Sequence, residues 1–222
     1  MLVRLWPWVA GVSLGLLIAG PLFAYSHLVK PIIGFLIFAL SLLPALAALV
    51  FGLLLLLGVG GERQVVSGLL SIAIGMVPLL VVAPGILKGA KLPRINDVTT
   101  DLDNPPAITE AAVYPEDFKE QVRAGYPDLK PVMLTETPQQ AFAKVEAALA
   151  KIPTIKVTRS DPASGVIEGQ DVTGLFRFVD DFTVRVSSAG SGTRIDMRSR
   201  SRVGKGDFGA NADRIRKVFS YL

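Results

Sequence analysis

Three long apolar segments occupy the first 90 residues and constrain the fold more than any other feature of the chain. They span about residues 5–25, 31–59 and 65–87. Each reaches or exceeds the roughly 20 apolar residues that an α-helix needs to cross the hydrocarbon of a bilayer. We therefore predict that residues 1–90 form an all-α transmembrane bundle of three helices.

The charged residues of this region lie at the ends of the apolar segments. Residues 1–91 hold five of the 23 Lys and Arg residues and one of the 19 Asp and Glu residues. No acid, base or amide lies deep inside a segment, where pumps and transporters usually place ionisable groups. We therefore interpret the region as an anchor rather than a transport unit. The flanking charges are too evenly balanced to set its orientation, and cleavage of the first segment as a signal peptide stays open.

Two rows of small residues mark candidate helix contacts. Gly11 and Gly15 lie four residues apart, and Ser67, Ser71 and Gly75 form a second row. Small side chains at this spacing allow two helices to approach closely. We interpret both rows as packing surfaces within the bundle. The alternative is contact between copies of the chain in a homo-oligomer.

The residues beyond 91 have the composition of a water-soluble domain and exclude several chemistries. The chain has no cysteine, and its single histidine, His27, lies beside the first apolar segment. Cysteine and histidine are therefore excluded from the domain as nucleophile, base or metal ligand. We assign it no catalytic residue, no metal and no cofactor; a Ser–Lys pair or two carboxylates remain as hydrolase options. The net charge of +4 comes from the membrane region, so nucleic acid is not an expected partner.

Periodicity within the soluble part predicts its fold. Residues 91–136 are proline-rich and read as linker and loop, with a short amphipathic stretch near 116–124. The domain core follows at 137–222, where Thr137 and Gln140 form a capping box for a helix that ends at Pro153. Strands are predicted at 154–159, 165–172, 174–179 joined to 181–187, and 193–203. A final helix begins near Asp207. This order predicts an α+β two-layer sandwich with a mainly antiparallel sheet.

The last predicted strand carries a row of charges on one face. Alternate side chains share a face, which places together Arg194, Asp196, Arg198, Arg200 and Arg202. Guanidinium groups in a row need solvent or acidic partners. They either pair with acids on neighbouring strands, for which Glu168, Asp171, Asp180 and Asp181 are candidates, or form a cradle for a carboxylate or phosphate.

Two further motifs resemble ligand sites. Gly204, Gly206 and Gly209 follow the pattern GxGxxG between a strand and a helix. We reject a dinucleotide site, since no second parallel strand follows, and interpret the glycines as a tight turn. Asp97, Asp101, Asp103 and Asn104 cluster in the loop after the membrane region; calcium binding is the alternative to ordinary turn chemistry there.

Two polar blocks carry a family resemblance. The sequences PRINDVTTDLDNPPAI at 93–108 and RSRSRVGKGDFGANADRIRK at 198–217 resemble the two signature blocks of the bacterial domain of unknown function 1499, and the likeness covers roughly 93–222. Ile108 departs from the aromatic residue expected there. The resemblance implies an extracytoplasmic domain and no particular reaction. It also implies that Arg214 falls on a motif position.

We therefore expect a multi-pass protein of the bacterial inner membrane with a periplasmic domain. The working hypothesis is that the 93–106 loop packs against the arginine face and the Gly204–Asp207 turn to bind an anionic small molecule or an envelope protein. The predicted ligand-binding residues are Asp97, Thr99, Thr100, Asp101, Arg198, Arg200, Arg202, Gly204, Asp207 and Asn211. A carboxylate-dependent hydrolase and a structural membrane scaffold are the alternatives.

Overall fold

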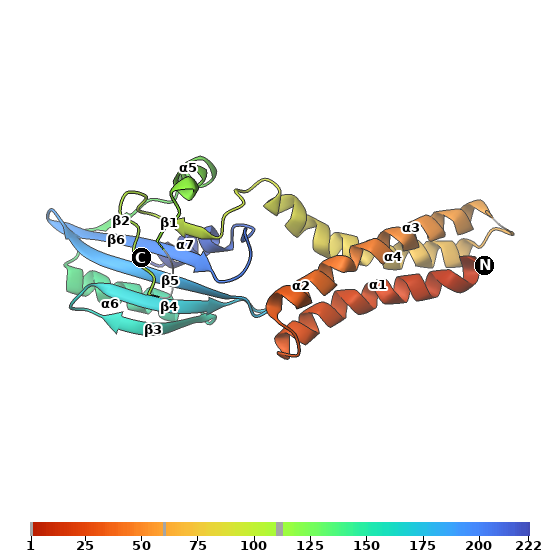
Figure 1. Ribbon diagram of the computed structural model, residues 1–222, viewed down its shortest axis with the longest axis horizontal. Helices are drawn as coiled ribbons and strands as arrows, with labels where there is room; N and C mark the ends of the chain where they lie inside the picture. The colour runs from red at the N-terminus through yellow and green to blue at the C-terminus, as the bar shows by residue number, and fades with distance from the viewer. Residues whose placement is uncertain (1, 60, 110–112) are drawn as a thin grey trace. The chain divides into compact units, whose positions relative to one another are not determined.

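The computed structural model describes residues 2–59, 61–109 and 113–222. The chain divides into two compact units, which are considered separately (Figure 1). The first comprises Met1–Lys88 with Leu175–Arg177, and the second comprises Gly89–Gly174 with Phe178–Leu222.

The first unit contains three helical spans that are long and apolar enough to cross a membrane. They are Leu2–Tyr25, Pro31–Leu57 and Val65–Gly89. The elements that form them are α1 (Leu2–Tyr25), α2 (Pro31–Leu40), α3 (Leu42–Leu57) and α4 (Val65–Gly89). The prediction of three apolar helices is confirmed, with ends that differ by a few residues.

The second span is one apolar run but two helices, because the helix breaks at Ser41. Pro44 lies just beyond the break; it has no N–H for the carbonyl four residues earlier, and its ring crowds that carbonyl. The Ser41 hydroxyl donates to the Phe38 carbonyl at 2.6 Å. The Ser13 hydroxyl of α1 donates to the Ser41 carbonyl at 3.1 Å. Side-chain hydroxyls thus satisfy backbone oxygens at the break, as a helix in lipid requires.

Glycine allows the closest helix approaches in this unit. A Cβ atom on Gly20 would collide with the backbone of α2 around Gly34. In the second small-residue row, Ser71 and Gly75 are buried, as predicted. Gly11 and Gly15 instead have open space where a Cβ would stand. Their predicted role in packing within the bundle is therefore wrong, since they lie on the outer side of α1.

The second unit is built on a six-stranded antiparallel sheet among the described residues. Four strands follow one another across it in the order β6, β5, β4, β3, and two short strands pair with the free edge of β6. The strands are β1 (Asp97–Thr99), β2 (Val132–Leu134), β3 (Ile155–Asp161), β4 (Val166–Val172), β5 (Val179–Ala189) and β6 (Gly192–Ser201). The sequence did not predict β1 and β2, and β5 begins later than expected.

Three helices complete this unit (Figure 1): α5 (Glu116–Gly125), α6 (Pro138–Ala150) and α7 (Ala210–Phe219). The capping box at Thr137 and Gln140 is present as predicted. Apolar residues of α6 and α7 share one core with the strands, including Val145, Ile195 and Ile215. The predicted fold class, an antiparallel sheet with helices, is confirmed. The segment read as linker and loop, 91–136, also contributes β1, α5 and β2.

The last helix begins three residues after Asp207, with Gly209 as its N-cap. Phe208 and Gly209 have φ angles of 54° and 83°, which no right-handed helix accommodates. The Asp207 carboxylate still accepts hydrogen bonds from the main-chain N–H groups of Gly209 at 2.8 Å and Asn211 at 2.9 Å. Asp207 therefore accepts hydrogen bonds from main-chain N–H groups at the start of α7, although it lies outside the helix.

Candidate functional site

The two polar signature blocks lie together in the structure. β1 pairs with β6 in the register that places Asp97 opposite Arg200 and Thr99 opposite Arg198. Asn96 extends this contact, because its side-chain amide donates to the Gly204 carbonyl at 2.7 Å. The first block thus packs against both the arginine face and the turn that follows β6, as the working hypothesis required.

A buried ion pair joins the two blocks. Arg198 donates from Nε and Nη2 to the Asp97 carboxylate at 2.9 and 2.7 Å, and both side chains are at least 97% buried. Its Nη1 donates to the Pro106 carbonyl at 3.3 Å. The ring of Tyr114 covers the guanidinium, and burial raises the pKa of the Tyr114 hydroxyl. These groups are satisfied by one another, so they support the fold.

A second cluster of charges lies further along β6. Asp196 accepts from Arg194 and Arg185 at 3.0 Å, and Asp101 binds the same two guanidinium groups at 3.0 and 2.8 Å. Asp101 also accepts from the main-chain N–H of Asn104 at 3.0 Å. One carboxylate therefore holds the turn of its loop and ties that loop to the sheet.

The remaining arginines of the face differ from each other. Arg202 forms two hydrogen bonds of 2.7 Å with Asp181. Arg200 lies 3.8 Å from the Asp97 carboxylate, too far for a hydrogen bond. The geometry therefore favours acidic pairing over an anion cradle. Among the described contacts, the proposed acid that binds this row is Asp181. The other acids that bind it are Asp97, Asp101 and Asp196.

On the opposite face of β6, Asn211 and Arg214 form a buried polar network. The Asn211 amide donates to Asp207 at 2.7 Å, and its oxygen accepts from Arg214 at 2.7 Å. Arg214 also donates to Asp180 at 2.6 Å and to Asp171 at 2.7 Å. Burial raises the pKa of the Asp180 carboxyl, and the Arg214 charge opposes this shift. Asn211, Asp207 and Gly204 thus hold the turn and the start of α7.

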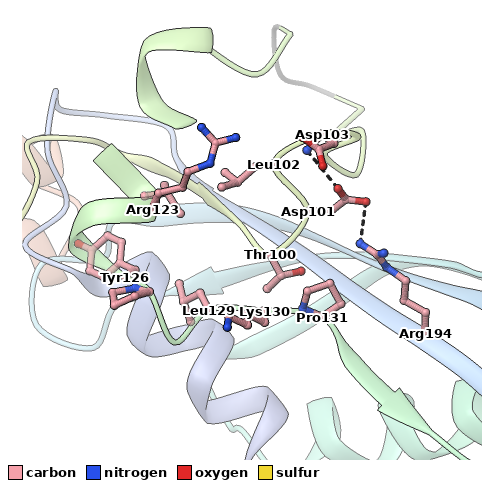
Figure 2. Close-up of a pocket in the computed structure, with 12 residues that line it drawn as sticks. Thr100, Asp101, Leu102, Asp103, Arg123, Tyr126, Leu129, Lys130, Pro131 and Arg194 are labelled. Carbon is pink, nitrogen blue, oxygen red and sulfur yellow. Dashed lines mark hydrogen bonds and ion pairs between the residues drawn. The ribbon is translucent and has the colours of Figure 1, made fainter. Parts of the chain in front are cut away.

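A cavity of about 400 Å³ opens beside the first block. Three cationic side chains from separate segments line it: Arg123 from α5, Lys130 from the following loop and Arg194 from β6 (Figure 2). Thr100, Asp101 and Asp103 supply its other polar groups. Its apolar wall consists of Leu102, Val122, Leu129 and two prolines, with the ring of Tyr126. A second cavity of about 220 Å³ lies over β4 and β5, beside Glu168 and Asp181.

Only two of the ten predicted ligand-binding residues, Thr100 and Asp101, line the larger cavity. Thr100 is also tied to β6, since its hydroxyl accepts from the Met197 N–H at 2.9 Å. The sequence prediction missed Arg123 and Lys130. They lie outside the two signature blocks, and a single basic residue on a surface helix or loop has no distinguishing pattern.

The comparison with known families covers most of the second unit. Residues 97–222 match the family described as protein of unknown function (DUF1499), over more than half of the chain. The chain belongs to this family. The match includes β1, the cavity residues and the network around Asn211, and it confirms the resemblance seen in the two polar blocks. No curated protein matches the chain.

Replacing Asp97 by Asn should destabilise the domain by about 3–5 kcal/mol, because it leaves the Arg198 guanidinium buried without its counter-charge. Hydrogen–deuterium exchange of the full chain in detergent measures this as faster exchange at β1 and β6. Asp128→Asn is the matched control, since the Asp128–Arg216 pair is half exposed and contributes at most about 1 kcal/mol. Equal losses for the two variants would contradict a dominant role for the buried pair.

Tyr126 should make the stability of the domain fall at alkaline pH. Burial raises the pKa of Tyr126 from 10.0 to about 12. The native state therefore holds the phenol proton more tightly than the unfolded state, and this contribution is present below pH 10.0 and lost as pH rises towards 12. Tyr126→Phe removes the titration, and the buried hydroxyl makes no hydrogen bond to the described residues.

The free energy of unfolding of Tyr126→Phe should equal that of the parent chain near neutral pH. Between about pH 8 and pH 12 it should fall by roughly 2–3 kcal/mol less than that of the parent chain. Urea unfolding of the full chain at a series of pH values measures the difference. Parallel pH profiles for the two proteins would refute the assignment.

Proposed function

We propose that this chain is a membrane-anchored, non-catalytic binding module whose ligand site is the cavity lined by Arg123, Lys130 and Arg194. The observation that carries the proposal is the convergence of these three cations, from three separate segments, on one apolar-walled cavity. Cations on an apolar wall suit a ligand with an anionic group and an apolar body.

The charge balance of the cavity supports an anionic ligand, because its lining holds three cations and two carboxylates, those of Asp101 and Asp103. Asp101 is already bound by two guanidinium groups, those of Arg185 and Arg194, so its negative charge is neutralised within the fold. Arg123 is exposed, and the ion pair that it forms among the described residues is a 3.4 Å contact with Glu120. Lys130 is exposed and forms no ion pair with the described residues. These two side chains provide the positive charge that a ligand would meet.

The same geometry gives less support to hydrolysis. A carboxylate pair would need one group free to transfer a proton and one free to act as base or nucleophile. Asp101 in the larger cavity, and Asp181 beside the smaller one, are bound to arginine. Glu168 accepts two hydrogen bonds from Thr109. These contacts support binding rather than hydrolysis, and the cavity itself supports a binding role rather than a purely structural one.

The ligand site is tested with hexyl phosphate, an anion with an apolar tail, titrated calorimetrically into the full chain in nanodiscs. Hexanol is the uncharged comparison, and empty nanodiscs supply the blank. We expect the phosphate to bind and the alcohol not to bind. Lys130→Gln should weaken binding about tenfold or more, as expected for loss of a charged hydrogen bond.

Lys151→Gln is the matched control, because Lys151 is exposed at the C-cap of α6 and lies over Tyr221, outside the cavity. The Lys151→Gln variant should bind hexyl phosphate with the same affinity as the parent chain. No binding of the phosphate, or equal weakening in both variants, would remove the cavity as the site.

We further propose that the domain faces the periplasm from the bacterial inner membrane. Support comes from the apolar spans and from the extracytoplasmic location that the family resemblance implies. Alkaline phosphatase fused to the carboxy terminus should be active, since this enzyme matures only outside the cytoplasm. A fluorescent cytoplasmic reporter at the same position should stay dark. The reverse pattern would place the domain in the cytoplasm.

A further inference from the structure

Two segments of the second unit lie side by side where the chain leaves its last apolar helix. Gly89 is the final residue of α4 and the first residue of this unit. The Phe208 ring fills the space beside Gly89 that a Cβ atom would occupy. Further along, the Asp207 N–H donates to the Ile95 carbonyl at 3.1 Å. The turn after β6 is therefore held against the segment that continues α4.

The exposed side chains of these two segments are basic or apolar, and we call them the juxtamembrane surface. Val203 and Phe208 are 45% and 48% exposed. Lys91, Arg94 and Lys205 are exposed, and none of the three forms an ion pair with the described residues. The acid of the turn, Asp207, accepts hydrogen bonds from the main-chain N–H groups of Gly209 and Asn211 at the start of α7. The surface thus combines uncompensated positive charge with two apolar groups.

In this turn, Phe208 has a backbone conformation that glycine adopts more readily than an aromatic residue does. Phe208 has a φ of 54°, between Gly204 at 96° and Gly209 at 83°. This left-handed conformation is unfavourable for a bulky L-residue. The turn therefore holds the Phe208 ring beside Gly89 while leaving it 48% exposed.

We propose that the juxtamembrane surface rests on the bilayer and binds the headgroups of anionic phospholipids. α4 is long and apolar enough to span a membrane, so a side chain packed on its last residue lies at the boundary between lipid and water. Lysine and arginine in this position are attracted by anionic lipid, and aromatic and aliphatic groups enter the interfacial layer. The contact is separate from the cavity and does not depend on its ligand.

Site-specific labelling tests the contact in the full chain, which has no native cysteine. Val203→Cys is labelled with a bimane fluorophore in nanodiscs that contain brominated phospholipids as quenchers. Ser191→Cys is the control position, because it is exposed at the opposite end of β6, roughly 30 Å along the strand. We expect strong quenching at position 203 and little at position 191, with more quenching at 203 when phosphatidylglycerol replaces part of the phosphatidylcholine.

Neutralising the cations separates the role of charge from simple proximity. The triple variant Lys91→Gln, Arg94→Gln, Lys205→Gln in the Val203→Cys background should abolish the preference for phosphatidylglycerol. Each of the three charges is expected to contribute roughly a fivefold gain in affinity for anionic lipid. Circular dichroism confirms that the variant is folded. Equal quenching at 203 and 191, or quenching independent of lipid charge, would overturn the proposal. So would cross-linking between the cysteines of two copies at 203, which would show a protein partner instead of lipid.

Discussion

The buried ion pair between Asp97 and Arg198 is the interaction on which the rest of the second unit depends. It joins residues 101 positions apart and holds a strand of only three residues on the edge of β6. Two charges removed from water carry a large desolvation cost, which is offset only when both are fully bonded. Here the Pro106 carbonyl, the Tyr114 ring and two carboxylate oxygens surround one guanidinium. Replacing either Asp97 or Arg198 by a neutral residue would leave the other charge buried without its counter-charge.

The position of the cavity follows from that pairing. Because β1 is held on β6, the chain beyond it must turn back over the sheet, and Asp101 secures this turn through Arg185 and Arg194. The loop then forms one wall of the space that α5 and the Lys130 loop close from the other side. Thr100, Asp101, Leu102 and Asp103 of the first signature block line the cavity, whereas Arg123 and Lys130 lie outside both blocks.

Side-chain hydrogen bonds also hold the turn at the other end of β6. At the GxGxxG pattern, the Asp207 carboxylate occupies the helix N–H groups that a dinucleotide phosphate would need. The turn instead lies along the segment that leaves α4 and exposes Phe208 and Lys205. A ligand cavity and a lipid-binding surface would then occupy two regions of one domain, both organised by contacts with β6.

The sequence by itself determined the features that depend on local pattern. The length of an apolar run decides whether a helix can span lipid, the Thr137–Gln140 capping box sets where α6 begins, and alternation of period two marks the strands. Only the tertiary structure decided which acid meets which arginine, where β1 and β2 pair, and that Arg123 and Lys130 line one cavity with Arg194. Such contacts join residues far apart in the chain. Their energy comes from burial and complementary charge, which the local sequence does not encode.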